Sequence, residues 1–153
     1  MGNEALGRQG SGLLARPVYA LSQLHQILTA RLERELAAVG LSLRTHQVLA
    51  CVAENAGGSQ QEVSDSIEVD RSEMVRIIDR LEQGGMVIRD RDQNDRRRYS
   101  LKLTPSGRRA LQRSERVIEA ATQDALSRLS ESERGALHDL TLRALGESRP
   151  GRS

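Results

Sequence analysis

The sequence predicts a mainly α-helical fold that contains one small β-hairpin. Apolar residues recur at intervals of three and four through most of the chain, which is the spacing of one helix face. Two short segments in the middle of the chain alternate apolar and polar residues instead, as half-buried strands do. The 153 residues include no Phe, no Trp and two Tyr. One compact domain with an aliphatic core is therefore expected, because such cores suit packed helices better than β-sandwiches.

A long first helix is predicted over residues 15–39, with Pro17 accepted in its first turn and Gly40 supplying its end. Residues 1–12 are rich in glycine, and residues 147–153 are similarly polar. Neither segment carries an apolar period, so we expect a disordered arm and a disordered tail. The predicted domain occupies residues 13–146.

Three shorter helices follow the first one. The earliest spans residues 43–54, with Val48 and Val52 among its inward residues. Ser59 begins a Ser-x-x-Glu capping box that opens the next helix. Asp70 caps the third, which ends at a pair of glycines. Its apolar residues fall at i, i+3, i+4 and i+7, and they are Met74, Ile77, Ile78 and Leu81.

The β-hairpin and two further helices complete the predicted order of elements. Residues 86–91 and 99–103 are the strands, and residues 92–98 form a polar loop between them. A Thr-Pro pair at 104–105 provides the N-cap and first position of a fifth helix that runs to about residue 129. A second Ser-x-x-Glu box at 130–133 opens a last helix that ends at residue 145.

Two short helices joined by a tight turn and followed by a hairpin form a winged helix-turn-helix, predicted here over about residues 43–104. An α-helix fits the major groove of B-DNA, so the outer face of the helix after Asp70 should carry the DNA contacts. The same face also carries Glu73 and Asp79, which leaves a merely solvated surface helix as the alternative. Val75 is suited to touch a thymine methyl. The candidate DNA-binding residues of this helix are Arg71, Ser72, Val75, Arg76 and Arg80.

The hairpin is the second basic feature. Residues 89–98 hold five Arg and three Asp. Guanidinium groups at a hairpin tip suit the minor groove, where the negative potential is concentrated. Asp95 lies close enough in sequence to pair with a neighbouring Arg and fix the shape of the loop. The alternative is a solvent-exposed turn that has no role in DNA binding. The candidate DNA-binding residues of the wing are Asp95, Arg96, Arg97 and Arg98.

Two segments carry patterns with a specific spacing. Residues 81–89 read LEQGGMVIR, and residues 92–107 contain Asp-x-x-Asp-x-Arg followed by Leu-Thr-x-x-Gly. These patterns resemble the "LExxGLVxR" and "DxxDxR…LTxxG" signatures of the MarR family of bacterial transcription regulators, and the resemblance extends over about residues 13–146. It implies that Arg97 enters the minor groove with Asp95 as its support. Family members often carry Ser or Thr in place of Glu73 and Val75.

The long terminal helices predict a homodimer, with dimerisation helices at about residues 15–39 and 105–145. A small DNA-binding lobe cannot cover all of their aliphatic surface, whereas a symmetric partner can. The same twofold axis would place two recognition helices about 34 Å apart, one turn of DNA. The first helix carries a heptad-like seam of Leu14, Val18, Leu21, Leu28 and Leu32. The later helices carry Leu111, Val117, Ile118, Leu126, Leu129, Leu137, Leu140 and Leu145.

The resemblance also implies a small-molecule effector, because MarR-like proteins are often released from DNA by small anions or phenols. For His25 and His46, the alternative is a role as hydrogen-bonded residues of an interface. For Cys51, the alternative is a role as a small, semi-buried apolar residue. The three histidines of the chain lack ligand-like spacing, so no metal and no cofactor is expected. The candidate lining groups of a ligand pocket are Tyr19, His25, Arg44, His46 and Cys51.

The function predicted from these features is sequence-specific binding of double-stranded DNA by a transcriptional regulator, with a repressor acting on an inverted-repeat operator as the first hypothesis. No nucleophile motif or phosphate-binding glycine loop is present, which argues against an enzyme. No apolar run approaches the roughly 20 residues of a membrane span, and a cytoplasmic location is expected. The alternative function is a winged-helix protein-interaction module without specific DNA binding. The sequence does not separate a repressor from an activator.

Overall fold

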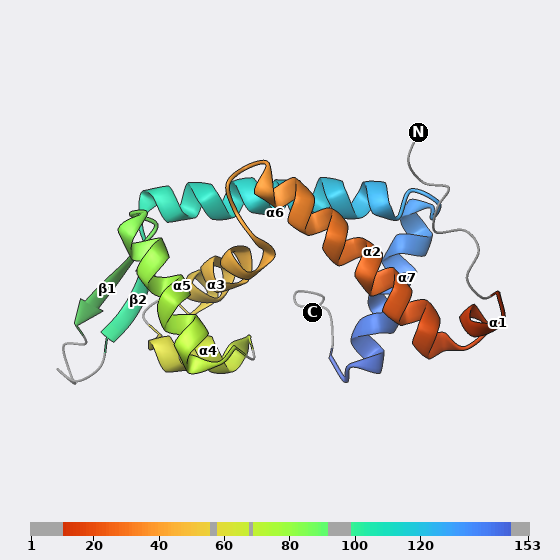
Figure 1. The fold of residues 1–153 in the computed structure, drawn as a ribbon, viewed down its shortest axis with the longest axis horizontal. Coiled ribbons are helices and arrows are strands. Elements are labelled where there is room, and N and C mark those ends of the chain that lie inside the picture. Colours follow the sequence, from red (N-terminus) through yellow and green to blue (C-terminus); the bar gives the residue numbers. More distant parts are fainter. Residues whose placement is uncertain (1–10, 56–57, 68, 92–98, 148–153) are drawn as a thin grey trace.

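The computed structural model describes residues 11–55, 58–67, 69–91 and 99–147 (Figure 1). Its helices and one antiparallel pair of strands confirm the predicted fold class. The elements are α1 (Ser11–Leu14), α2 (Pro17–Ala37), α3 (Leu43–Glu54), α4 (Gln60–Ser66), α5 (Arg71–Gln83), β1 (Val87–Arg91), β2 (Tyr99–Leu103), α6 (Pro105–Ala125) and α7 (Glu131–Ala144).

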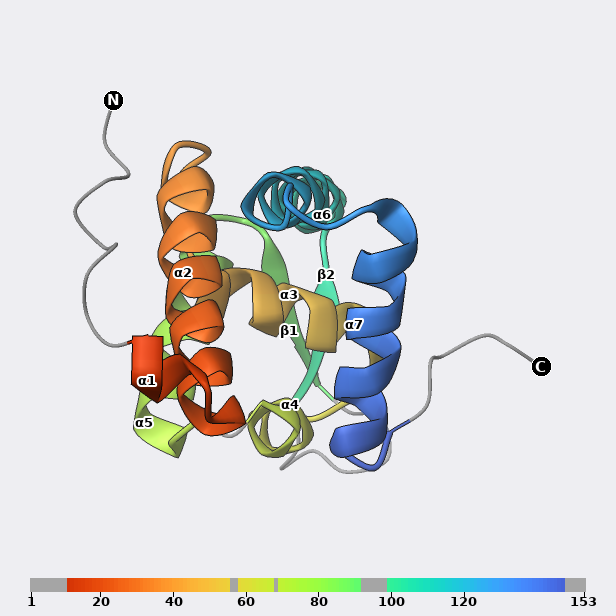
Figure 2. The ribbon, with the colours of Figure 1, turned by 90° about the vertical axis from the view of Figure 1, so that its right-hand side faces the viewer.

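Helix α6 runs along the length of the molecule and connects its two ends (Figure 1). One end is a lobe made of α3, α4, α5 and the β-hairpin. At the other end α2 packs against α6, and α7 descends from the far end of α6. Viewed along α6, helices α2 and α7 lie on opposite sides below it (Figure 2). The predicted DNA-binding lobe therefore lies at one end of α6, and α2 and α7 lie toward the other end.

The core lies in the lobe and is aliphatic, as the composition predicts. Helix α5 contributes its i, i+3, i+4 and i+7 residues, and all four are buried. They pack with residues of α3, α4, the hairpin and the start of α6. The members of this cluster are Val48, Leu49, Val52, Val63, Val69, Met74, Ile77, Ile78, Leu81, Val87, Leu101, Leu103, Ala110 and Leu111. This packing fixes which face of α5 remains outside.

The first predicted helix differs from the observed one. Instead of one helix over residues 15–39, α1 and α2 are separated at Arg16, whose φ of −101° and ψ of 125° are extended. The cause is Pro17, because a residue that precedes proline is disfavoured in the helical region. The predicted disordered arm also overlaps the helix α1, so it is wrong at residues 11–12; residues 1–10 lie outside the described part of the chain.

Smaller differences concern the other element ends. Helix α6 ends at Ala125 rather than near residue 129, because Leu126 departs from helical geometry and a turn follows. The first strand begins at Val87, one residue later than predicted. The backbone N–H of Glu147 donates to Leu142 (2.8 Å), so this residue belongs to the helix end and not to the predicted tail. Residues 148–153 lie outside the described chain. Both Ser-x-x-Glu capping boxes and the Asp70 cap are confirmed.

The start of α6 is joined directly to the start of the hairpin. The Thr104 side-chain oxygen accepts from the Gly107 N–H (3.0 Å) and the hydroxyl donates to the Gly85 carbonyl (2.6 Å). The Thr104 N–H donates to the Met86 carbonyl (3.0 Å). A Cβ at Gly107 would lie 2.0 Å from that same carbonyl oxygen. The Leu-Thr-x-x-Gly pattern is thus a helix cap followed by a close backbone contact.

Helices α3 and α6 are joined by a partly buried hydrogen bond. The Ser114 hydroxyl, which is buried, donates to the Leu111 carbonyl (2.7 Å), so its oxygen accepts from Nδ1–H of His46 (2.9 Å). Burial lowers the pKa of His46 below its ordinary value, although the Glu115 carboxylate opposes this effect. His46 is therefore the neutral Nδ1–H tautomer at neutral pH. It attaches the lobe to the long helix.

We expect Gly107→Ala to destabilise the protein by about 3 kcal/mol, because the clash between the new methyl group and the Met86 carbonyl can be relieved only by moving the backbone. The measurement is the free energy of unfolding in urea. Gly12→Ala is the matched control, since a Cβ at that position meets nothing within 4 Å. Equal stability of the two variants would contradict the close contact between α6 and the hairpin.

Candidate nucleic-acid interface

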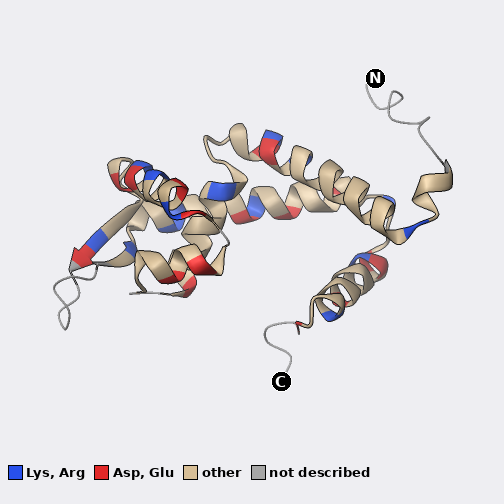
Figure 3. Ribbon diagram, turned by 60° about the horizontal axis from the view of Figure 1, so that its bottom comes forward, with Lys and Arg blue, Asp and Glu red and all other residues tan. Residues whose placement is uncertain are grey.

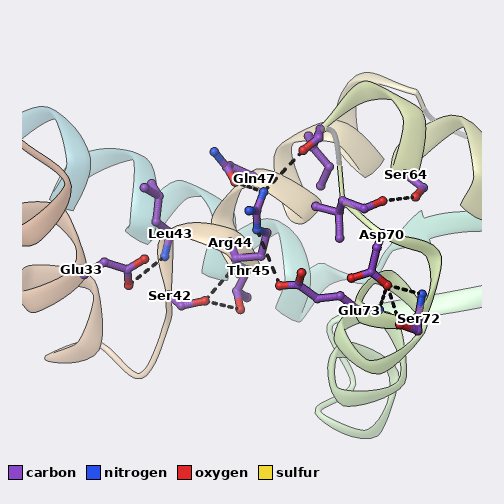
Figure 4. Close-up of polar contacts among 12 residues, drawn as sticks. Glu33, Ser42, Leu43, Arg44, Thr45, Gln47, Ser64, Asp70, Ser72 and Glu73 are labelled. Atoms are coloured by element: carbon purple, nitrogen blue, oxygen red, sulfur yellow. Dashed lines mark hydrogen bonds and ion pairs between the residues drawn. The ribbon is translucent and has the colours of Figure 1, made fainter. Parts of the chain in front are cut away.

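The turn between α4 and α5 is fixed by side chains (Figure 4). The buried hydroxyl of Ser64 on α4 donates to the Val69 carbonyl (2.9 Å), just before α5 begins. Asp70 then accepts the backbone N–H groups of Ser72 (2.8 Å) and Glu73 (3.0 Å). The pKa of Asp70 is lowered by the hydrogen bond from the Ser72 hydroxyl and by the backbone N–H of Glu73. A charged carboxylate therefore caps α5, where it also meets the positive end of the helix dipole.

Arg44 on α3 connects all three helices of the lobe. Its Nη1 donates to Gln47 Oε1 (3.1 Å) and to the Ile67 carbonyl (3.5 Å), and its Nε lies 4.0 Å from Glu73 Oε1 (Figure 4). From the sequence, Arg44 is expected only as a lining group of a ligand pocket. The structure adds a bracing role between α3, the end of α4 and α5.

The outer face of α5 carries the predicted residues. Arg71, Arg76 and Arg80 are exposed, and no hydrogen bond or ion pair holds their side chains to another residue in the described ranges. Val75 is 37% exposed. The Ser72 hydroxyl, in contrast, donates to Asp70 Oδ1. Arginine side chains that are not engaged within the fold are available to phosphates and guanine edges.

Arg89 lies between the hairpin and α5. Its guanidinium donates to Asp79 Oδ1 (2.6 Å) and also to Glu82 Oε2. Burial alone would lower the pKa of Arg89, but the hydrogen bond to Asp79 and the charge of Glu82 raise it. From the sequence, Arg89 is one of the five arginines of the segment 89–98. Its observed partners instead make it a half-buried cation that neutralises two carboxylates of α5.

The remaining charges of the lobe are mixed. Lys102 Nζ pairs with Asp90 Oδ2 (2.8 Å) across the two strands. Basic and acidic segments lie together on the lobe that carries the hairpin (Figure 3). The candidates Asp95, Arg96, Arg97 and Arg98 lie outside the described residues, as does the rest of segment 92–98. Basic and acidic side chains are therefore interspersed on the described surface of the lobe, and the arginines of α5 are part of this mixture.

The five candidate pocket residues lie at different places. Tyr19 and His25 are exposed residues of α2, whose N-terminal end lies far from the lobe (Figure 1). Arg44 and His46 lie in the first turns of α3 with the partners described above. Cys51 lies later in α3 against the core, and burial, together with Glu54, raises the pKa of its thiol. Arg44 and His46 are two residues apart on α3, but the side chain of Arg44 contacts Gln47 and Ile67, whereas that of His46 contacts Ser114 on α6. The described contacts therefore do not bring the five candidates together in one pocket.

One cavity of about 340 Å³ lies elsewhere in the lobe, between the end of α3, β2 and the start of α6. Its lining residues, Val52, Ala53, Lys102, Leu103 and Arg108, include none of the five pocket candidates. Among the described residues, no group of three or more His, Cys, Asp or Glu side chains is arranged to hold a metal ion. No helix in the described part of the chain is both long and apolar enough to span a bilayer.

Comparisons with known proteins agree with this geometry. Residues 41–99 match the model of the MarR family. A protein of Thauera aromatica named for transcriptional regulation of the hcr operon is 39% identical over 104 residues. That match covers 68% of this chain and 63% of the relative, so it leaves more than a third of the relative's length unmatched.

Solved structures extend the similarity over most of the chain. The transcriptional repressor CouR, bound to a 23-mer DNA duplex, superimposes with a TM-score of 0.80 and 27% identity, covering 90% of this chain and 98% of CouR. MarR of E. coli in its apo form shares the fold, with a TM-score of 0.77, 22% identity and coverage of 85% of this chain and 96% of MarR. These relatives are regulators and not enzymes. On this evidence the chain belongs to the MarR family of transcriptional regulators.

Proposed function

We propose that this chain is a repressor that binds an inverted-repeat DNA operator as a homodimer. Each recognition helix α5 lies in a major groove, and each wing enters the flanking minor groove through Arg97, with Asp95 as its support. The observation that carries the proposal is the outer face of α5. Three arginines there, Arg71, Arg76 and Arg80, have side chains uncommitted to other described residues. The similarity to a repressor bound to a DNA duplex supports the same assignment.

Neutralisation of the acidic residues of α5 supports DNA binding further. Asp79 and Glu82 would repel phosphates if they were unpaired. Glu73 and Asp79 are the acidic residues of this helix that give weight to a protein-interaction module. Arg89 pairs with both carboxylates. Among the described residues, the charged side chains of α5 that make no ion pair are then Arg71, Arg76 and Arg80.

Exposed apolar residues at the helical end of the molecule support a homodimer. Val18 and Leu21 on α2 are 66% and 59% exposed, and Leu145 after α7 is 71% exposed. No residue of α7 is buried. Helices of this kind gain stability when a second copy covers their apolar faces. The twofold axis of such a dimer would place two copies of α5 about 34 Å apart.

We also propose an effector that releases the DNA. A small anion or phenol bound between the dimer base and the lobe would act near Arg44 and His46, with Tyr19 and His25 of α2 and Cys51 as further candidate contacts. His46 supports this position, because it attaches α3 to α6 where the lobe meets the long helix. A ligand there would act on the joint that sets the angle of the lobe.

Binding to genomic DNA fragments tests the function. The purified protein is expected to retain short fragments that contain an inverted repeat, with an affinity that falls linearly in a plot of log affinity against log salt concentration. Arg76→Ala and Arg80→Ala are each expected to lower the affinity about tenfold or more, as loss of a base or phosphate contact does, and Arg97→Ala to weaken binding similarly. Arg128→Ala, beyond the far end of α6, is the matched control and should bind as the wild type.

Failure of the wild type to retain any fragment at about 50 mM salt, where phosphate contacts are strong, would contradict DNA binding and support the protein-interaction module. Transcription from a promoter carrying the retained site should fall when the protein is added. A rise in transcription would contradict the repressor assignment and would identify the protein as an activator.

The double variant Val18→Glu/Leu21→Glu tests the homodimer. It is expected to be monomeric, because burying unpaired carboxylates in an apolar interface costs several kcal/mol. Sedimentation equilibrium gives the mass, and circular dichroism checks that the helices persist. Gln26→Glu, which adds one carboxylate at an exposed polar position of α2, is the control. A dimeric double variant would exclude this face of α2 from the interface.

Arg89→Ala tests the neutralisation of α5. We expect its DNA affinity to fall about tenfold at 0.1 M salt, because two carboxylates then face the phosphates within about a Debye length. The triple variant Arg89→Ala/Asp79→Asn/Glu82→Gln should regain most of the lost affinity. If the triple variant binds as weakly as the single one, Arg89 contacts DNA directly and the neutralising role is wrong.

A further inference from the structure

We infer that Val75 determines operator specificity by contacting the 5-methyl group of one thymine in each half-site. The inference rests on the proposed binding of α5 in the major groove. Val75 is 37% exposed, whereas the other apolar residues of α5, Met74, Ile77, Ile78 and Leu81, are all buried in the core. An exposed aliphatic side chain therefore stands on the face that carries the arginines.

The polar side chains beside Val75 are already engaged within the protein. The Ser72 hydroxyl donates its hydrogen to Asp70, so it cannot also donate to a base. Asp79, one turn after Val75, accepts from Arg89 (2.6 Å) and is held toward the hairpin. Glu82 accepts from the same guanidinium. These three residues are thus poor readers of base edges. Glu73 lies 4.0 Å from Arg44, and Gln83 is the last residue of α5, so the arginines and Val75 are the remaining candidates in the rest of the helix.

The helical geometry places Val75 close to arginine on the same surface. Arg71 precedes it by four residues and lies one turn away on the same side of the helix. Val75 is also within the first two turns of α5, the part of a recognition helix that reaches base edges. A base contact from Val75 and a phosphate or guanine contact from a neighbouring arginine are therefore compatible in one docking geometry.

The chemistry of valine selects the base. Its two methyl groups form no hydrogen bonds, so they cannot distinguish the donor and acceptor patterns of the major groove. Thymine alone presents an apolar group there, the 5-methyl. Covering that methyl group removes apolar surface from water on both partners. A half-site recognised in this way contains a thymine near the bases or phosphates that the arginines contact.

Deoxyuridine provides the sharpest test, because it lacks only the methyl group and pairs with adenine as thymine does. A short duplex retained by the wild type is prepared with each thymine replaced in turn by deoxyuridine, and the affinity of each duplex is measured at one salt concentration. The wild type should lose affinity about fourfold at one thymine position in each half-site, the loss expected for one methyl group. Val75→Ala should bind the unsubstituted duplex more weakly and be insensitive to deoxyuridine at that position.

Ile88→Ala is the matched control. Ile88 is 48% exposed on β1, outside α5, and its replacement likewise removes exposed apolar surface. This variant should reproduce the wild-type pattern at every thymine. A Val75→Ala pattern identical to that of the wild type, or a wild type insensitive at all positions, would overturn the inference while leaving DNA binding intact. Absence of DNA binding by the wild type would overturn the proposed function and this inference with it.

Discussion

The contact between the start of α6 and the start of the hairpin is the constraint on which the rest of the structure depends. At Met86 the chain has just left α5, and its carbonyl accepts from Thr104 where the chain leaves β2. Gly107 allows α6 to begin against that carbonyl because it has no Cβ. One small region thus sets the direction of the recognition helix, the hairpin and the long helix together, and the four buried residues of α5 then fix the rotation of α5.

Local sequence patterns were sufficient for most of the fold. The two Ser-x-x-Glu boxes and Asp70 act through contacts within three residues, so they could be recognised without tertiary structure. The break at Arg16 was missed because Pro17 is compatible both with the first turn of a helix and with an extended preceding residue. The early end of α6 has no comparable local signal, since apolar residues continue through the turn that follows it.

In the candidate site too, some features follow from local sequence patterns and others depend on tertiary contacts. The outward position of Arg71, Val75, Arg76 and Arg80 follows from helix periodicity, which the sequence contains. The partners of Arg89 and Arg44 do not, because they come from elements that are brought together only by folding. Asp79 and Glu82, three residues apart on α5, were a usable signal: two carboxylates on one side of a recognition helix need a cation, and Arg89 is the first basic residue of the following strand.

The length of α6 has a mechanical consequence. Its 21 residues make a rod of about 31 Å. Near the middle of the rod, α3 is attached through His46 and Ser114, and at its C-terminal end Arg31 of α2 pairs with Asp124. A tilt of about 5° at the α2 end displaces the lobe end by about 3 Å, nearly the rise of one base pair, by the geometry of a rigid helix of this length. A small tilt at the α2 end of the rod therefore becomes a larger displacement of the lobe, comparable to the spacing of base pairs in DNA.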